Sequence, residues 1–204
     1  MHNYEATQDF SVELKKWYTH NQSKTVHDLL IFFGEKSFAV LFLLFMFIPS
    51  LPIPSGGITT LVLIPRTIIA SLQMIFGRRT LWLPGKIKRI PLNSSFLKKA
   101  IPFMVRRIEW LEKFSRPRFS YLFNKAIFRS IIGITVFALA IAVQLAPPFS
   151  FLDTLPSLGI VLIALAVILG DISFYFIGLA IGIVGVGVII ALASTVTLIF
   201  RSVF

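Results

Sequence analysis

The sequence predicts an all-α integral membrane protein with four to six membrane helices. Of its 204 residues, 56% are apolar and only 14% are charged, and the mean hydropathy is +0.84. A soluble domain carries about 25% charged residues, so this chain has too few charges for a fully water-facing surface. Apolar runs alternate with two proline-rich turns, and one strongly basic segment separates them. The composition therefore argues against a soluble enzyme and against a nucleic-acid-binding protein.

The first segment, residues 1–25, is polar and mixed in charge, and it lacks the apolar run of a signal peptide. Phe10, Leu14 and Trp17 recur at helical spacing, which predicts a short surface helix. The spacing of the three histidines of the chain fits no metal motif, and the absence of cysteine excludes disulfides and thiolate sites. We therefore expect no metal and no other cofactor.

Residues 26–77 are predicted to form the first pair of membrane helices. The first helix should begin near Thr25, a favourable N-cap, and run to Ile48 across Gly34-Glu35-Lys36. Its unbroken apolar part begins at Phe38 and reaches only ~16 Å, about half of a ~30 Å hydrocarbon core. If the helix instead spans the membrane from Val26, then Glu35 and Lys36 lie at depth.

The turn at 49–57 and the helix after it both contain proline. Three prolines and two glycines in residues 49–57 cannot continue a helix. Residues 58–77 are apolar again but are interrupted by Pro65-Arg66, and Gln73 is the other polar group. Proline kinks an apolar helix, and an arginine inside one is a candidate site residue by default.

Residues 78–129 form a basic segment that carries the positive charge of the whole chain. It contains 14 Lys and Arg and only two acids, whereas the net charge of the protein is +11. Within it, residues 101–114 show an apolar face and a basic face, which predicts a helix in the membrane interface near anionic lipid headgroups. The alternative is that its apolar face packs on the rest of the protein. The positive-inside rule places this segment in the cytoplasm.

The second membrane region, residues 130–204, repeats the order of the first. An apolar helix leads to a proline-rich turn at 147–156, and a second apolar helix ends at Gly170-Asp171. This similarity predicts two helix–proline turn–helix units, an arrangement common in transport proteins. Gly178 and Gly182 lie one helical turn apart and permit close helix contact, although glycine is also simply frequent in membrane helices.

Several short motifs, in this order and spacing, make the chain resemble the ExoD family of exopolysaccharide synthesis. They cover roughly residues 25–180, and the sequence departs at Ile172, where that family often has glycine after the aspartate. The resemblance implies a bacterial inner-membrane protein linked to secreted polysaccharide, but it implies no particular reaction. The motifs are Gly34-Glu35-Lys36-Ser37-Phe38, Ile48-Pro49-Ser50-Leu51-Pro52-Ile53-Pro54-Ser55-Gly56, Gln73 with Gly77-Arg78-Arg79, Trp82-Leu83-Pro84, Arg116-Pro117-Arg118, and Leu155-Pro156 with Gly170-Asp171.

Ionisable and polar groups at the edges of the apolar runs are the candidate substrate-binding residues. No hydrolase triad, P-loop, zinc-protease or dinucleotide motif is present, so an enzyme is disfavoured. One hypothesis is a transporter that handles a lipid-linked or anionic precursor. The other is a non-catalytic partner that regulates or recruits polysaccharide machinery through its basic face. The candidates are Glu35, Arg66, Gln73, Arg78, Arg79 and Asp171.

Purely structural roles are the alternative for the same residues. The side chains of Lys36 and Arg66 can extend to the membrane surface, and Glu35 can pair with Lys36. The expected partners are the lipid bilayer, anionic headgroups, polysaccharide-synthesis proteins and a second copy in a homodimer, but not nucleic acid. Because the helices beside both proline-rich turns are short, we expect hairpins whose tips lie close together within the membrane near one cavity, with Arg66 or Asp171 nearby. The alternative is that both turns are ordinary exterior loops over a thinned bilayer.

Overall fold

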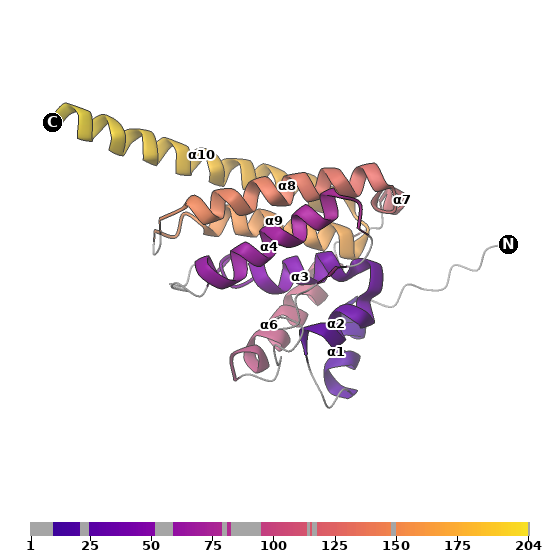
Figure 1. Cartoon of the computed structure of the whole chain (residues 1–204). Coiled ribbons are helices and arrows are strands. Elements are labelled where there is room, and N and C mark those ends of the chain that lie inside the picture. The colour runs from indigo at the N-terminus through magenta and orange to yellow at the C-terminus, as the bar shows by residue number, and fades with distance from the viewer. Residues whose placement is uncertain are drawn as a thin grey trace.

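The computed structural model describes residues 10–20, 25–51, 59–78, 81–82, 95–113, 115, 118–147 and 150–203. Within these ranges the regular elements are helices and no strand occurs, which confirms the predicted all-α class for this part of the chain. Figure 1 shows α3, α4, α8, α9 and α10 packed together in a bundle, with α1, α2 and α6 grouped on one flank. The bounds are α1 Phe10–His20, α2 Val26–Phe33, η1 Gly34–Lys36, α3 Ser37–Met46, η2 Thr59–Leu63, α4 Ile64–Ile75, α6 Ser95–Glu112, α7 Ser120–Phe123, α8 Ala126–Leu145, α9 Thr154–Leu169 and α10 Ile172–Val203.

The start of α2 agrees with the predicted N-cap, but the helix does not continue unbroken to Ile48. Thr25 Oγ1 accepts a hydrogen bond from the amide of Asp28, and the Asp28 carboxylate accepts one from the amide of Thr25. This reciprocal pair is a capping box. Gly34 then adopts φ +49° and opens the short 3₁₀ turn η1. A single unbroken helix from Val26 to Ile48 is therefore wrong, because the left-handed glycine separates α2 from α3, and a crossing by this segment stays a prediction.

The flanking group packs around a small apolar contact between α1, α2 and α6. Phe10 and Leu14 of α1 are buried, and the ring of Phe10 lies 4.8 Å from that of Phe33 on α2. Val105 and Ile108 of α6 are buried too, and α6 contacts α1. This part of the apolar face of α6 is thus covered by protein, and an interfacial position of α6 stays a prediction.

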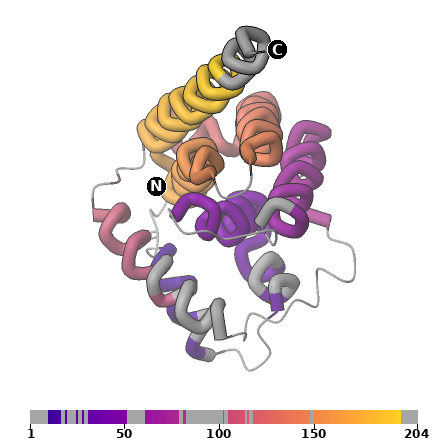
Figure 2. Tube along the Cα trace, turned by 90° about the vertical axis from the view of Figure 1, so that its left-hand side faces the viewer, coloured from indigo at the N-terminus to yellow at the C-terminus, as the bar shows by residue number. Residues whose placement is uncertain are grey.

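Two antiparallel hairpins, α3–α4 and α8–α9, form the centre of the bundle. Helix α3 contacts α9, and α4 contacts α8, so the hairpins pack side by side. All ten residues of α3 are buried, and most of α9 is buried as well. Figure 2, which looks along the bundle, shows α9 beside α3 and α8 beside α4. The two hairpins have the same order of elements, although a sequence repeat stays a prediction.

The two ends of the bundle carry different segments. We call the end where both hairpins turn the proline end (residues 47–51, 59–63, 145–147 and 150–156). We call the opposite end, where α3 and α8 begin and α4 and α9 end, the basic end (residues 34–36, 76–78, 81–82, 118–129 and 170–171). Both turns lie at the same end in Figure 1, but residues 52–58 fall outside the described ranges, so the expected contact between the turns stays untested.

Glycines bring α10 very close to α9. A Cβ on Gly178 would lie 2.7 Å from the carbonyl oxygen of Gly159, and a Cβ on Gly159 would lie 2.9 Å from Cα of Gly182. A Cβ on Gly182 would also lie 2.7 Å from the methyl carbons of Leu139 on α8. The close helix contact that the Gly178 and Gly182 spacing permits is therefore realised in the fold.

Within the described part of the chain, two helices are long and apolar enough to cross a membrane by length and composition, namely Ala126–Leu145 and Ile172–Thr195. Leu61–Ile75 and Thr154–Leu169 are apolar but shorter. The expected four to six membrane helices are therefore not confirmed as crossings. The segment boundaries at 25, 77 and 129 follow composition, and they stay predictions.

Candidate functional site

Three candidate site residues lie at the surface of the basic end or outside the described ranges. Glu35 is exposed in η1, next to the exposed Lys36, and Arg78 is exposed just after α4. The backbone amide of Arg78 donates to the carbonyl of Gln73, 3.1 Å away. Arg79 lies outside the described residues. Glu35 and Arg78 are thus available to a partner at the surface rather than to a ligand inside the bundle.

Gln73 holds the chain that follows α4. Its Nε2 donates to the carbonyl of Trp82, and its Oε1 accepts from the amide of Trp82, both at 2.9 Å. The side-chain amide of Gln73 thus pairs with the backbone of Trp82 through both its donor and its acceptor. Positioning of the segment around Trp82 therefore accounts for Gln73 without a substrate.

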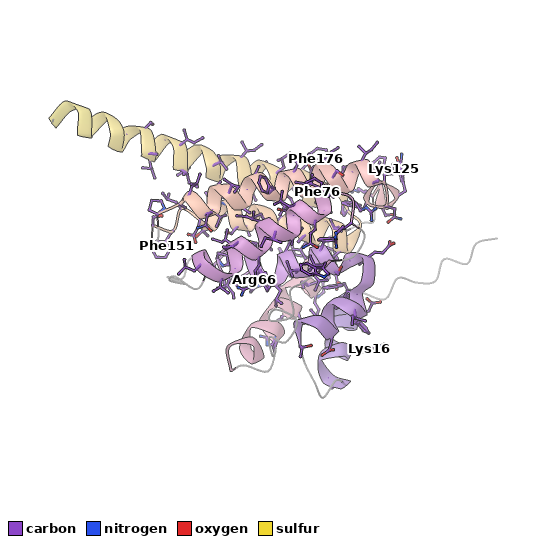
Figure 3. All side chains as sticks on the ribbon, in the orientation of Figure 1. Lys16, Arg66, Phe76, Lys125, Phe151 and Phe176 are labelled. Carbon is purple, nitrogen blue, oxygen red and sulfur yellow. The ribbon has the colours of Figure 1, made fainter. Side chains whose placement is uncertain are left out.

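Arg66 is satisfied in part by its own helix. Its Nη1 donates to the carbonyl of Val62, one turn earlier, at 2.5 Å. Val62 belongs to the π-helical turn η2, directly before α4, and Pro65 occupies the first turn of α4. Figure 3 shows Arg66 on α4, away from Lys125 at the basic end. A half-buried arginine bonded to its own backbone costs less in an apolar setting than an unpaired one.

Asp171 is buried between α9 and α10, with 3% of its surface exposed. Its Oδ1 accepts the amide of Ser173 at 3.0 Å, so Asp171 caps the N-terminus of α10. Gly170, at φ +68°, ends α9 in the left-handed conformation that favours glycine, and this allows the chain to reverse within two residues. Asp171 therefore has a structural role in the turn between the two helices.

The described candidates do not all lie together: Glu35, Arg78 and Asp171 belong to the basic end, whereas Arg66 lies on α4 away from it. Glu35 and Arg78 lie at the surface of the basic end, Arg66 bonds to its own helix, and Asp171 caps another. Among the described residues, no group of three or more His, Asp or Glu side chains is placed to hold a metal ion. A shared polar site for a substrate thus gains no support from these side chains.

Exposed aromatic and basic side chains do gather at the basic end. Phe119 and Tyr121 are both exposed, with ring centroids 6.2 Å apart, and Lys125 Nζ lies 5.3 Å from the Tyr121 ring centroid. Phe76 at the end of α4 is 82% exposed, and Trp82 is exposed as well. We call this set, together with the exposed cations of the same segments, the basic-end surface: Phe76, Arg78, Trp82, Arg118, Phe119, Tyr121 and Lys125.

Two polar contacts that join distant helices were not expected from the sequence. The amide and the hydroxyl of the buried Ser11 both donate to the Glu112 carboxylate, which ties α1 to the end of α6. The hydroxyls of Thr135 and Tyr175 share a hydrogen bond of 3.1 Å between α8 and α10. Both pairs lie far apart in sequence, so no local pattern could have identified them.

A comparison with known families identifies the chain. The family described as "Exopolysaccharide synthesis, ExoD" matches residues 10–191. The chain belongs to the ExoD family. The resemblance inferred from the short motifs is thereby confirmed. Membership of the ExoD family links the chain to exopolysaccharide synthesis, and together with the two long apolar helices it supports a membrane protein.

Among curated proteins, an uncharacterized protein of Synechocystis sp. is similar to this ExoD family member. The two are 30% identical over 132 residues, which cover 62% of this chain and 58% of the relative. The match thus spans less than two thirds of the relative's length. No solved structure matches the chain.

Proposed function

We propose that this protein is a non-catalytic partner in exopolysaccharide synthesis, held in the bacterial inner membrane. One observation carries the proposal: Arg66 and Asp171 have local structural partners, whereas exposed cations and aromatic rings, Arg78 among them, collect on the basic-end surface. A transporter would need its polar groups to face one path. A partner protein instead needs an accessible surface.

The chemistry of the basic-end surface suits an acidic protein surface. Arg118 and Lys125 provide two exposed cations, and the neighbouring rings of Phe119 and Tyr121 provide rigid apolar area. Aromatic residues and arginine are enriched in protein interfaces and contribute much of their binding energy. The positive-inside rule places this surface in the cytoplasm, where it can reach both polysaccharide-synthesis proteins and anionic lipid headgroups.

A second candidate function, the handling of a lipid-linked or anionic precursor, has one specific observation in its favour. The helix pair α3–α4 is interrupted by the π-helical turn η2 and by Pro65, and Arg66 follows directly. Many transporters build their substrate sites from discontinuous helices, and a cation within an apolar helix is a candidate site residue. In this function Arg66 would be essential, whereas in the partner function it is dispensable.

Complementation of a strain that lacks the gene separates the two functions. The test variant carries Arg118→Glu and Lys125→Glu, and its control carries Arg118→Lys and Lys125→Arg, which keep both charges. Secreted polysaccharide per cell and the amount of protein in the membrane are measured together. We expect the charge-reversed variant to lose most of the secreted polysaccharide at a normal protein level, while the control retains it.

The same assay with Arg66→Gln tests the alternative. If Arg66→Gln abolishes polysaccharide secretion at a normal protein level while charge reversal at the basic end has no effect, the partner function is wrong and precursor handling gains support. If Arg66→Gln secretes normally, precursor handling through this residue is refuted.

A further inference from the structure

The two ends of the bundle expose opposite kinds of side chain. Residues 47–66 and 143–158, which include the proline end, contain two charged residues, Arg66 and Asp153, and Arg66 donates to the carbonyl of Val62 in its own helix. The same end exposes large apolar side chains, with Leu145 73% and Phe151 48% exposed, and Leu61 and Leu155 exposed too. Figure 3 shows Phe151 and Lys125 at opposite ends of the bundle. An exposed apolar patch of this kind marks a surface that meets lipid or protein rather than water.

Helix α8 has 20 residues and is long enough to cross a membrane, but Arg129 lies in its first turn and its hairpin partner α9 is shorter. Counted from the last cation, Arg129, α8 has an uncharged length of about 24 Å up to Leu145, at ~1.5 Å per residue. Helix α9 has 16 residues and also reaches about 24 Å. Both values fall short of a hydrocarbon core of ~30 Å. With the basic end at one membrane surface, the hairpins therefore stop before the other surface.

Helix α10 continues where the hairpins stop. Gly185 lies against Leu155 and Pro156 in the first turn of α9, so α10 passes the proline end at this point. From Val186 to Phe200 the sequence has no charged residue, which gives a further ~22 Å of apolar helix. Residues 187–195 are exposed apart from the half-buried Ile189, and Figure 1 shows α10 extending beyond α8 and α9. If the proline end lay at the aqueous surface, this apolar stretch would project into water.

The described parts of both turns make hydrogen bonds within the protein, as backbone at membrane depth must. Irregular backbone in hydrocarbon must have its hydrogen bonds made within the protein. In the second turn the amide and the hydroxyl of Ser150 both donate to the carbonyl of Pro147. In the first turn the amide of Ser50 donates to the carbonyl of Met46, and its hydroxyl donates to the carbonyl of Phe47. Proline suits such a turn because it has no amide hydrogen that would need an acceptor.

We infer that the proline end lies inside the hydrocarbon of the membrane. Both hairpins enter and leave on the basic side, and α10 alone reaches the opposite surface. Acyl chains cover Leu145, Phe151 and the part of α10 that lies within the remaining ~6 Å of the ~30 Å core. This inference concerns membrane position, and it goes beyond the proposed partner function because neither docking nor precursor handling requires it.

Site-directed spin labelling tests the depth of the proline end, and the absence of native cysteine makes each introduced thiol unique. Leu145→Cys and Phe151→Cys report on the proline end, Lys125→Cys on the basic end, and Ile183→Cys on the exposed side of α10. The full chain carries a nitroxide label in vesicles of phosphatidylethanolamine and phosphatidylglycerol. Collisions with oxygen, which concentrates in hydrocarbon, are compared with collisions with the water-soluble complex NiEDDA.

We expect the labels at Leu145 and Phe151 to match Ile183, with frequent oxygen collisions and a loss of nearly all NiEDDA collisions relative to Lys125. NiEDDA collisions at Leu145 and Phe151 as frequent as at Lys125, with Ile183 still protected, would overturn the inference and leave the membrane assignment intact. Protection of Ile183 from both reagents would mean that a second copy covers α10, and would overturn the assignment of lipid as its neighbour. NiEDDA access at Ile183 itself would refute this inference and the membrane setting of the proposed function together.

Discussion

Replacing Gly178 with alanine tests how tightly α10 packs on α9. The added methyl group would lie 2.7 Å from the carbonyl oxygen of Gly159 and 3.0 Å from the backbone nitrogen of Ile163. Both neighbours are backbone atoms, so the clash cannot be relieved by a rotation of a side chain. The two helices must separate, and they lose part of the packing between them.

Gly187→Ala is the matched control because it makes the same change on the same helix. A Cβ at Gly187 would have no atom of the chain within 4 Å. Alanine is favoured over glycine in a helix interior by about 1 kcal/mol, and this gain applies to both variants. Overpacking of a tight contact costs about 1–3 kcal/mol, and this cost applies only at Gly178. The free energy of unfolding should therefore be about 1–3 kcal/mol lower for Gly178→Ala than for Gly187→Ala.

Unfolding by sodium dodecyl sulfate in mixed micelles, followed by far-ultraviolet circular dichroism, measures this difference. Gly187→Ala should shift the midpoint to the same or a higher detergent fraction than the unmodified chain, and Gly178→Ala should shift it lower. Equal midpoints for the two variants would refute the close approach of α9 and α10.

Three further predictions concern contacts outside this helix pair. Gln73→Leu removes two hydrogen bonds to the backbone of Trp82, worth roughly 1–3 kcal/mol together. Trypsin should therefore cleave the chain after α4 about tenfold faster. An unchanged rate would contradict the role of Gln73 in holding Trp82. Glu112→Ala leaves the buried amide and hydroxyl of Ser11 without their acceptor, so hydrogen exchange of the α1 amides should rise at least about fivefold, and equal exchange would rule out this attachment. A cysteine in place of Lys99 should resist an impermeant maleimide in intact cells, whereas labelling would reverse the proposed orientation.

The apolar helices and most of their interruptions could be predicted because local chemistry decides them, although the break at Gly34 was not expected. Proline and left-handed glycine end helices through their own backbone, so the turn after Met46 and the reversal at Gly170 follow from the residues present. Thr25 with Asp28 is a local capping pair and is equally visible. The helix spacing of Phe10 and Leu14 correctly indicated α1.

The roles of the candidate site residues could not be predicted, because each depends on a partner that composition does not reveal. A charged residue in an apolar run is a candidate site residue, but the sequence does not show that Arg66 bonds to Val62 or that Asp171 caps the helix after it. The hydrogen-bond partner of Gln73 is Trp82, nine residues along the chain, and the sequence alone does not show that the chain brings the two together. The apolar face of residues 101–114 likewise does not show which helix it packs against, so the contact between α6 and α1 could not be predicted.

The complete burial of α3 has a consequence for the synthesis of the protein. The helix that covers it, α9, begins about 110 residues after α3 ends. At a synthesis rate of about 5–20 residues per second, the ribosome takes roughly 5–20 s to produce that cover. During this interval α3 has only its own hairpin partner, and its remaining apolar surface must rest against lipid or the insertion machinery. The N-terminal hairpin therefore reaches its final packing only after the C-terminal third has emerged, so a ribosome that stalls before α9 leaves an unfinished membrane domain for quality-control proteases.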